Sequence, residues 1–198
     1  MRDVIIPTAA TMKFNEAVDD VLDAGKGTSG FILSYGQAGR GKSVAADQYH
    51  YQRGGAYVRV WEGWTQAAFL QRVLFEVRGK NGDLPRMSAD RCKQSIVELL
   101  ERDRQPIFVD EADRLAIGRI EDLRDILEMT GAPIILIGEE NKIIDSIKRV
   151  DFTVSQKRQV LPGLFYEMPP GQDKQNPLTV PGEQISEIVH AAEGEQFA

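Results

Sequence analysis

One stretch of eight residues constrains this sequence more than any other. Residues 36–43 read Gly-Gln-Ala-Gly-Arg-Gly-Lys-Ser and match the pattern G-x-x-x-x-G-K-[ST] in full. An apolar run, Phe31–Tyr35, precedes the match, and a helix is expected to begin near Lys42. Glycines let the backbone wrap around a phosphate with its N–H groups pointing inward, and the helix behind them favours an anion at its N-terminus. The pattern therefore predicts a strand, a phosphate-binding loop and a helix, in that order.

Within such a loop, Lys42 supplies a mobile positive charge for the β- and γ-phosphates, and the Ser43 hydroxyl can join the shell of a Mg²⁺ ion. A glycine-rich loop that matches by accident is the alternative, expected in on the order of one such chain in a hundred. The strand and helix on either side favour nucleotide binding, with ATP and Mg²⁺ as cofactors. The predicted binding residues are Gly36, Gln37, Ala38, Gly39, Arg40, Gly41, Lys42, Ser43 and Val44.

A pair of acids follows a second apolar run. The apolar run Pro106–Val109 is followed by Asp110, which lies 68 positions after Lys42, and then by Glu111. Asp110 is predicted to hold Mg²⁺ directly or through water. Glu111 is predicted to orient and polarise an attacking water, which favours hydrolysis over transfer to a small acceptor. Glu111 and Lys42, the latter through its charge on the phosphates, are the predicted catalytic residues. The alternative is an acidic start to a helix, favoured by the helix dipole.

Apolar runs alternate with amphipathic segments along the chain, a pattern typical of an α/β fold with a mostly parallel sheet covered on both faces. Strands are expected at residues 31–35, 56–60, 107–109 and 134–137. Helices are expected at residues 13–24, from 42 onward, after the capping residues Thr65 and Ser88, at 118–130 and around 143–150.

Composition indicates a single domain. The 198 residues are 42% hydrophobic and include one cysteine, Cys92, so an internal disulfide is excluded. No apolar run approaches the roughly 20 residues of a membrane span, and the N-terminus lacks a signal-peptide pattern, so a soluble, cytoplasmic protein is expected. The last 34 residues hold six acids and one base. The predicted division is a core at 1–164 and an acidic, proline-containing tail at 165–198.

Together these motifs resemble a known group. Gly36–Ser43 as Walker A, Phe108–Glu111 as Walker B and the run Asp110–Leu115 are similar to the AAA+ ATPases of the bacteriophage Mu B transposition protein type. Transposon target-selection ATPases and type II secretion ATPases are related proteins. The aromatic stretch Trp61–Thr65 and the segment Ala132–Glu140 are also similar to that group, and the resemblance covers residues 11–149.

The resemblance implies an AAA+ P-loop NTPase fold of the ASCE type, a three-layer sandwich around the parallel sheet. It implies an ATPase that self-associates on double-stranded DNA and delivers this DNA to a transposase. The sensor-1 residue would be Glu139, Glu140 or Asn141, and the arginine finger Arg149 or Arg158. The basic pairs at 148–149 and 157–158 also fit a solvated basic face.

The sequence departs from that group after Leu161, where no helical bundle is evident and the last arginine is Arg158. The C-terminal lid is therefore predicted to be reduced or absent. Three other functions stay open: a nucleotide-binding module of reduced or no hydrolysis, a secretion-type AAA+ ATPase, and a small-molecule P-loop kinase.

Two further groups of residues allow both a binding and a structural role. Trp61 and Trp64 could stack on adenine or on a DNA base, although aromatic residues after a strand more often pack against the core. A set of basic residues could contact phosphates if the fold gathers them, or could form an ordinary charged surface. This set comprises Lys13, Arg40, Arg53, Arg59, Arg72, Arg78, Lys80, Arg86, Arg91 and Lys93.

Overall fold

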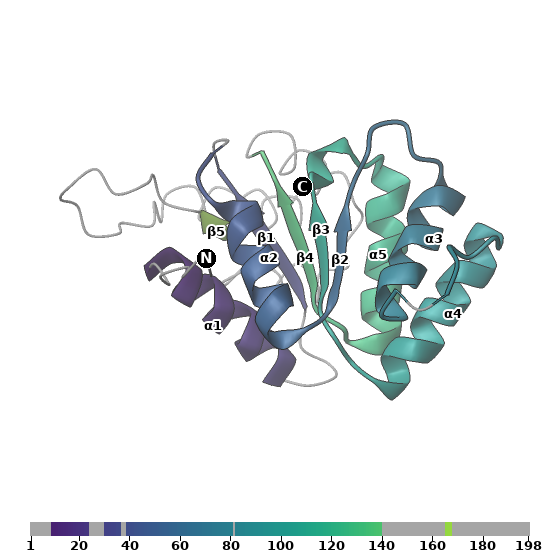
Figure 1. Ribbon diagram of the computed structural model, residues 1–198, viewed down its shortest axis with the longest axis horizontal. Helices are drawn as coiled ribbons and strands as arrows, with labels where there is room; N and C mark the ends of the chain where they lie inside the picture. The colour runs from purple at the N-terminus through teal and green to yellow at the C-terminus, as the bar shows by residue number, and fades with distance from the viewer. Residues whose placement is uncertain (1–8, 24–29, 37–38, 81, 140–164, 168–198) are drawn as a thin grey trace, which may run out of the picture.

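The computed structural model describes residues 9–23, 30–36, 39–80, 82–139 and 165–167. Strands and helices alternate over most of this range (Figure 1). The strands are β1 (Phe31–Tyr35), β2 (Ala56–Arg59), β3 (Ile107–Asp110), β4 (Ile134–Gly138) and β5 (Phe165–Glu167). The helices are α1 (Ala9–Asp23), α2 (Lys42–Arg53), α3 (Gln66–Val77), α4 (Ala89–Arg102), the short 3₁₀ helix η1 (Ala112–Arg114) and α5 (Ile117–Thr130).

The five strands form one sheet in the order β2-β3-β4-β1-β5, and every neighbouring pair is parallel. All carboxyl ends therefore meet at one edge of the sheet, which lies at the top in Figure 1. β4 lies between β1 and β3, so the glycine loop after β1 and the acids at the end of β3 are two strands apart. The sequence pattern predicted a tail from residue 165, whereas the structure pairs β5 with β1.

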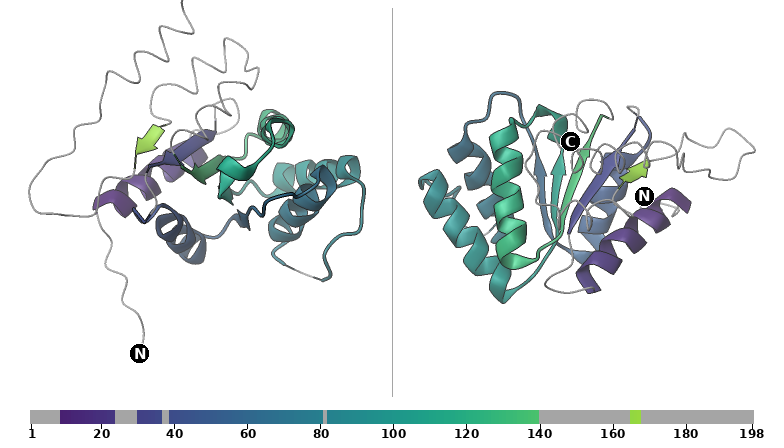
Figure 2. Two further views of the ribbon diagram at one scale, coloured as in Figure 1. Left: turned by 90° about the horizontal axis from the view of Figure 1, so that it is seen from above. Right: turned by 180° about the vertical axis from the view of Figure 1, so that it is seen from behind.

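The helices cover both faces of the sheet, as the strand pattern predicts. Phe14 of α1 and Tyr49 of α2 both pack on Phe108 of β3, with ring centroids 6.3 and 5.4 Å apart. Figures 1 and 2 show α1 and α2 on one face, and α3, α4 and α5 on the other. This division follows from right-handed crossovers, because the connection from β1 to β2 runs across the sheet in the opposite direction to the connections from β2 to β3 and from β3 to β4.

Local signals place the helix ends close to the predicted positions. The side chains of Thr65 and Ser88 accept hydrogen bonds from the backbone N–H groups of Ala68 and Arg91, which caps α3 and α4. Gly131 ends α5 with φ of 68°, a left-handed conformation that glycine adopts without strain. α1 begins at Ala9, four residues earlier than predicted. No helix in the described part of the chain is both long enough and apolar enough to cross a membrane.

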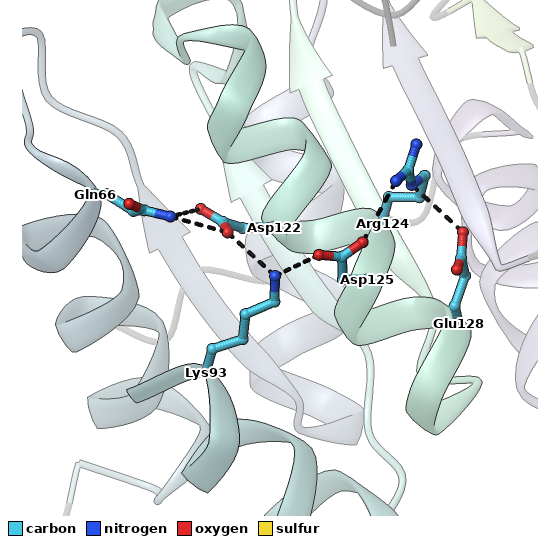
Figure 3. Close-up of polar contacts among 6 residues, drawn as sticks. All are labelled: Gln66, Lys93, Asp122, Arg124, Asp125 and Glu128. Atoms are coloured by element: carbon cyan, nitrogen blue, oxygen red, sulfur yellow. Dashed lines mark hydrogen bonds and ion pairs between the residues drawn. The ribbon is translucent and has the colours of Figure 1, made fainter. Parts of the chain in front are cut away.

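Polar side chains join the three helices on one face, and we call Gln66, Lys93, Asp122 and Asp125 the helix cluster (Figure 3). Asp122 is 6% exposed and accepts two hydrogen bonds from the Gln66 amide, at 3.1 and 2.9 Å. Lys93 Nζ lies 3.2 Å from Asp122 Oδ1 and also donates to Asp125. Burial acts to lower the pKa of Lys93, but its hydrogen bonds to Asp125 and Asp122 outweigh burial and raise this pKa. Lys93, expected at the surface as a phosphate contact or a solvated charge, is instead a structural cation.

Candidate nucleotide-binding site

The glycine loop has the backbone geometry that the motif requires. Gly39 and Gly41 adopt φ of 78° and 84°, a region where a residue with a Cβ would be strained. Lys42, the first residue of α2, is 8% exposed, and its Nζ donates a hydrogen bond to the carbonyl of Gly36 at 2.8 Å. The ammonium group thus reaches back to the start of the loop. Gln37 and Ala38 lie outside the described residues.

Ser43 and Asp110 meet across the intervening strand. Ser43 Oγ donates a hydrogen bond to Asp110 Oδ1 at 2.8 Å, although the two residues are 67 positions apart. The backbone N–H of Glu111 donates to the same oxygen at 3.0 Å. Asp110 is 2% exposed, so its charge is almost fully removed from water. Two of the predicted site residues are therefore in direct contact.

Tyr57 and Arg59 of β2 complete the surroundings of Asp110. Tyr57 Oη donates to Asp110 Oδ2 at 3.0 Å, and Arg59 Nε lies 3.6 Å from the same oxygen. Burial and the negative charge of Asp110 raise the pKa of Tyr57 well above its ordinary value of 10.0, so its hydroxyl stays a donor. Neither residue was predicted for the metal site. The register between β2 and β3 identifies both residues, because it pairs Tyr57 with Phe108 and Arg59 with Asp110.

Glu111 turns away from the strand in an unusual conformation. Its φ of 58° is left-handed, which costs a residue with a side chain on the order of 1–2 kcal/mol. Its carboxylate is 31% exposed and lies 3.5 Å from Arg59 and 3.3 Å from Arg114. The acidic helix start weighed for this segment is present as well, because η1 follows directly. Backbone strain of this kind is typical of functional positions.

The oxygen donors at this edge suit Mg²⁺. A magnesium ion takes hard oxygen ligands and is usually bound through one or two carboxylates together with substrate phosphates. Asp110 Oδ1 and Ser43 Oγ offer such a pair, 2.8 Å apart. Among the described residues no group of three or more His, Cys, Asp and Glu side chains could hold a metal by itself. The residues present therefore fit an ion that is shared with a phosphate.

The remaining sequence candidates are placed only in part. Arg40 is half-buried, Val44 is 56% exposed on α2, and Glu139 is exposed at the end of β4, where its backbone N–H donates to Asp113 at 3.4 Å. The candidates Glu140, Asn141, Arg149 and Arg158 and the helix expected around 143–150 lie outside the described residues.

Several members of the predicted basic set pair with acids of this chain. Arg53 pairs with Asp19, Arg59 with Asp110 and Glu111, and Arg72 and Lys80 with the buried Glu76. These side chains are engaged within the domain, so the basic set as a whole does not form one unpaired surface.

A parallel sheet in this order, with a glycine loop after β1 that meets the acid at the end of β3, defines the chain as a P-loop nucleotide-binding α/β protein. Comparison with known families sharpens this class. The chain matches the AAA domain family over residues 25–145, more than half of its length. The protein belongs to the AAA domain family.

A solved structure agrees with this fold. The chain is similar to Cdc6p from Pyrobaculum aerophilum, with a TM-score of 0.56 and 17% sequence identity over 98% of this chain and 52% of that one. It thus spans about half the length of that protein. A slighter similarity, with a TM-score of 0.40, links it to Pif1 from Bacteroides sp. in complex with ADP-AlF4, at 16% identity over 79% of this chain and 36% of that one.

A second family match overlaps the first. Residues 107–197 match the NFACT N-terminal and middle domains. Two Rqc2 homologs named RqcH are similar: that of Streptococcus suis is 41% identical over 34% of this chain and 13% of its own, and that of Streptococcus pneumoniae is 31% identical over 49% and 18%. The chain spans less than a fifth of these relatives. Where the two family matches overlap, the described strands β3 and β4 belong to the P-loop sheet, and α5 connects them.

Proposed function

We propose that this protein binds ATP together with Mg²⁺ and hydrolyses it to ADP and phosphate. The observation that carries the proposal is the hydrogen bond of 2.8 Å between Ser43 Oγ and Asp110 Oδ1. This contact joins the glycine loop to the acid of β3 across β4, so both halves of one site lie at the same edge of the sheet.

Each residue has a distinct task in this reaction. The loop N–H groups and the Lys42 ammonium bind phosphate oxygens, and α2 directs its N-terminus at the same anion. Ser43 and Asp110 hold Mg²⁺, which supplies charge neutralisation on the phosphates. Tyr57 acts as a positioning residue, because its hydroxyl fixes Asp110 Oδ2 and leaves Oδ1 on the side of Ser43.

Glu111 is the proposed general base. Its carboxylate accepts a proton from the attacking water as the water oxygen bonds to the γ-phosphorus; the bond from this phosphorus to the bridging oxygen breaks, and ADP leaves. Arg114 and Arg59 lie 3.3 and 3.5 Å from this carboxylate. Because such partly exposed ion pairs are weak, the carboxylate can exchange these partners for water.

The wider role proposed is that of a DNA-dependent AAA+ ATPase that self-associates on double-stranded DNA and assists a transposase. The resemblance of the Walker segments and of Trp61–Thr65 to the Mu B type supports this role. In such an ATPase, ATP and its hydrolysis products stabilise the assembled state to different extents, so hydrolysis shifts the equilibrium between assembled and unassembled protein.

ATP hydrolysis measured with and without duplex DNA tests the proposal, with Glu111→Gln as the diagnostic variant. Loss of a general base is expected to reduce turnover by on the order of 10²- to 10⁴-fold while ATP binding survives. Glu98→Gln, at an exposed position of α4, is the matched control and should behave like the wild type.

Other outcomes separate the alternatives. ATP binding without turnover in the wild type would identify a binding module and contradict the proposal. Turnover that requires a small-molecule acceptor would identify a kinase. Hydrolysis that is indifferent to duplex DNA would keep the ATPase and reject the DNA-dependent role.

A further inference from the structure

Beside the nucleotide-binding edge lies a small cleft that the proposed hydrolysis does not use. It encloses about 170 Å³ between the loop after β2 and the segment that leads into α5. This volume lies below the roughly 300–1,000 Å³ of typical small-molecule pockets, so the cleft suits a single flat group. The side chains and backbone that line it belong to Val60, Trp61, Gly63, Trp64, Phe69, Arg114, Leu115, Ala116 and Arg119.

The cleft holds both tryptophans of the chain. Trp64 packs against the hydrophobic core, and Trp61 lies over it, with ring centroids 6.2 Å apart and an interplanar angle of 28°. Trp61 is nevertheless 66% exposed. A large aromatic surface is thus stacked on a residue that packs against the core and is exposed to solvent, an arrangement in which an aromatic side chain can serve as a stacking platform for a base.

Two arginines supply positive charge to the same cleft. Arg119 forms no ion pair with any described residue, and its Nε is buried without a hydrogen-bond partner there. Among the described residues, Arg114 forms a single weak pair, at 3.3 Å from Glu111 Oε2. Glu62, the carboxylate of the intervening loop, is exposed and does not line the cleft. A flat ring beside two guanidinium groups is complementary to a base with its phosphate.

We propose that this cleft binds an unpaired nucleotide of a nucleic-acid strand, with the base stacked on Trp61 and the phosphate on Arg114 and Arg119. A base inside a duplex cannot reach a stacking partner in this way, so the cleft selects single-stranded over fully paired DNA. The inference rests on the proposed function for one consequence only: a phosphate that engages Arg114 draws it away from the general base Glu111.

Binding is measured first, without ATP, by the anisotropy of a labelled dT oligonucleotide of about ten nucleotides, a length within the site sizes of single-strand-binding domains. The intrinsic fluorescence of wild-type protein should be quenched, because Trp61 and Trp64 are the only tryptophans. Trp61→Ala should weaken binding at least tenfold. Tyr51→Ala, which removes another exposed aromatic residue, on α2, is the matched control and should bind like the wild type.

Arg119→Met gives an independent reading of the phosphate contact. It should weaken binding and reduce the slope of log K against log salt concentration by about 0.7, the value for one phosphate contact to a single strand. Both variants change exposed or half-buried positions, and their thermal unfolding shows whether they are folded.

Three results would overturn the inference: equal binding by Trp61→Ala and wild type, an equal loss of blunt-duplex and single-strand binding in Trp61→Ala, or equal binding of polyphosphate, which has no base to stack. The hydrolysis assay is read separately. If the wild type binds the strand through Trp61 but does not hydrolyse ATP, the inference about the cleft is supported and the proposed function is wrong. If the strand binds but leaves the rate of hydrolysis unchanged, the link through Arg114 is wrong.

Discussion

Two groups of residues are built around a buried carboxylate, the helix cluster around Asp122 and the sheet edge around Asp110, and the two carboxylates are neutralised in different ways. In the helix cluster, Asp122 receives two N–H groups from Gln66 and the ammonium of Lys93 at 3.2 Å. At the sheet edge, Asp110 receives two hydroxyls and one backbone N–H, and Arg59, the cation paired with it, lies 3.6 Å away with a side chain that is 62% exposed. Among the described residues, the buried carboxylate of the first group has an ammonium close to it, whereas that of the second is oriented by neutral donors and pairs with an exposed arginine.

This difference separates a structural cluster from a binding site. A buried charge costs several kcal/mol unless a good partner compensates for it, so a fold does not retain one without a cause. In the helix cluster, the buried charge is retained because its contacts join α3, α4 and α5. At the sheet edge, the proposed cause is the affinity for Mg²⁺, and five tests compare the two groups.

The largest effect is expected from removing one charge in each group. Asp110→Asn should reduce ATP turnover by about a hundredfold or more, because a Mg²⁺ ligand contributes several kcal/mol in the transition state. Its effect on the free energy of unfolding should stay below about 1 kcal/mol. Asp122→Asn should do the opposite: turnover within about twofold of the wild type, and a loss of stability of about 2 kcal/mol. Steady-state hydrolysis and urea unfolding of both variants provide the comparison, and equal effects on turnover would remove the distinction.

Lys93→Met should destabilise the domain by about 3 kcal/mol, because it leaves the carboxylate of Asp122 buried without its cation. The double variant Lys93→Met, Asp122→Leu should recover more than half of this loss, since a buried ion pair replaced by apolar groups is close to neutral. Urea unfolding measures both. A double variant less stable than Lys93→Met would show that the pair itself stabilises the domain.

Alkaline pH provides a second test of the contribution of Lys93 to stability. Since its pKa is raised in the folded state, its contribution to stability is complete below the ordinary value of 10.5 and is lost as pH rises through the folded-state pKa. The stability difference between the wild type and Lys93→Met should therefore be constant near neutral pH and shrink above pH 10.5. A difference that shrinks below pH 9 would contradict the assignment of this shift to Lys93.

Tyr57→Phe should have a moderate effect, and this effect should be confined to the affinity for Mg²⁺. Loss of the hydroxyl frees Asp110 Oδ2, and loss of such an orienting partner typically weakens metal affinity by 10- to 100-fold. The Mg²⁺ concentration for half-maximal turnover should rise by about tenfold at the lower end of that range. Tyr49→Phe is the matched control, because the Tyr49 hydroxyl donates to Asp19 on the same face. An equal Mg²⁺ requirement in both variants would show that Tyr57 does not position the metal ligand.

Arg59→Gln should have the smallest effect. The Arg59 side chain is 62% exposed, and its distances to Asp110 and Glu111 are long, at 3.6 and 3.5 Å, so each pair is expected to contribute about 1 kcal/mol or less. Turnover should change by less than about fivefold, and less again at high salt. A loss as large as that of Asp110→Asn would assign Arg59 a direct role in the reaction.

Much of this fold could be predicted from the sequence because its signals are local. The glycine pattern, the apolar runs and the capping residues Thr65 and Ser88 each act within a few residues, and the strands and caps are confirmed to within one residue. The chemistry proposed for Lys42 and Ser43 follows from the same motif.

What the sequence did not predict depends on which segments become neighbours. The contact of Tyr57 with Asp110 requires β2 beside β3 in one register, and neither follows from composition or period. Lys93 belongs to a helix whose charges are typical of a solvated face, until α5 brings Asp122 against it. The strand Phe165–Glu167 lacks the aliphatic run that marks the other strands, which is why this segment was predicted as tail.

The glycine loop and the acids of β3 are proposed to hold one metal–nucleotide complex. Electron paramagnetic resonance with Mn²⁺, which accepts the same oxygen ligands, tests it directly. Wild-type protein with ATP should immobilise Mn²⁺, Ser43→Ala and Asp110→Asn should each weaken this binding at least tenfold, and Asp122→Asn should not. Equal Mn²⁺ binding by the wild type and Asp110→Asn in the presence of ATP would contradict the claim.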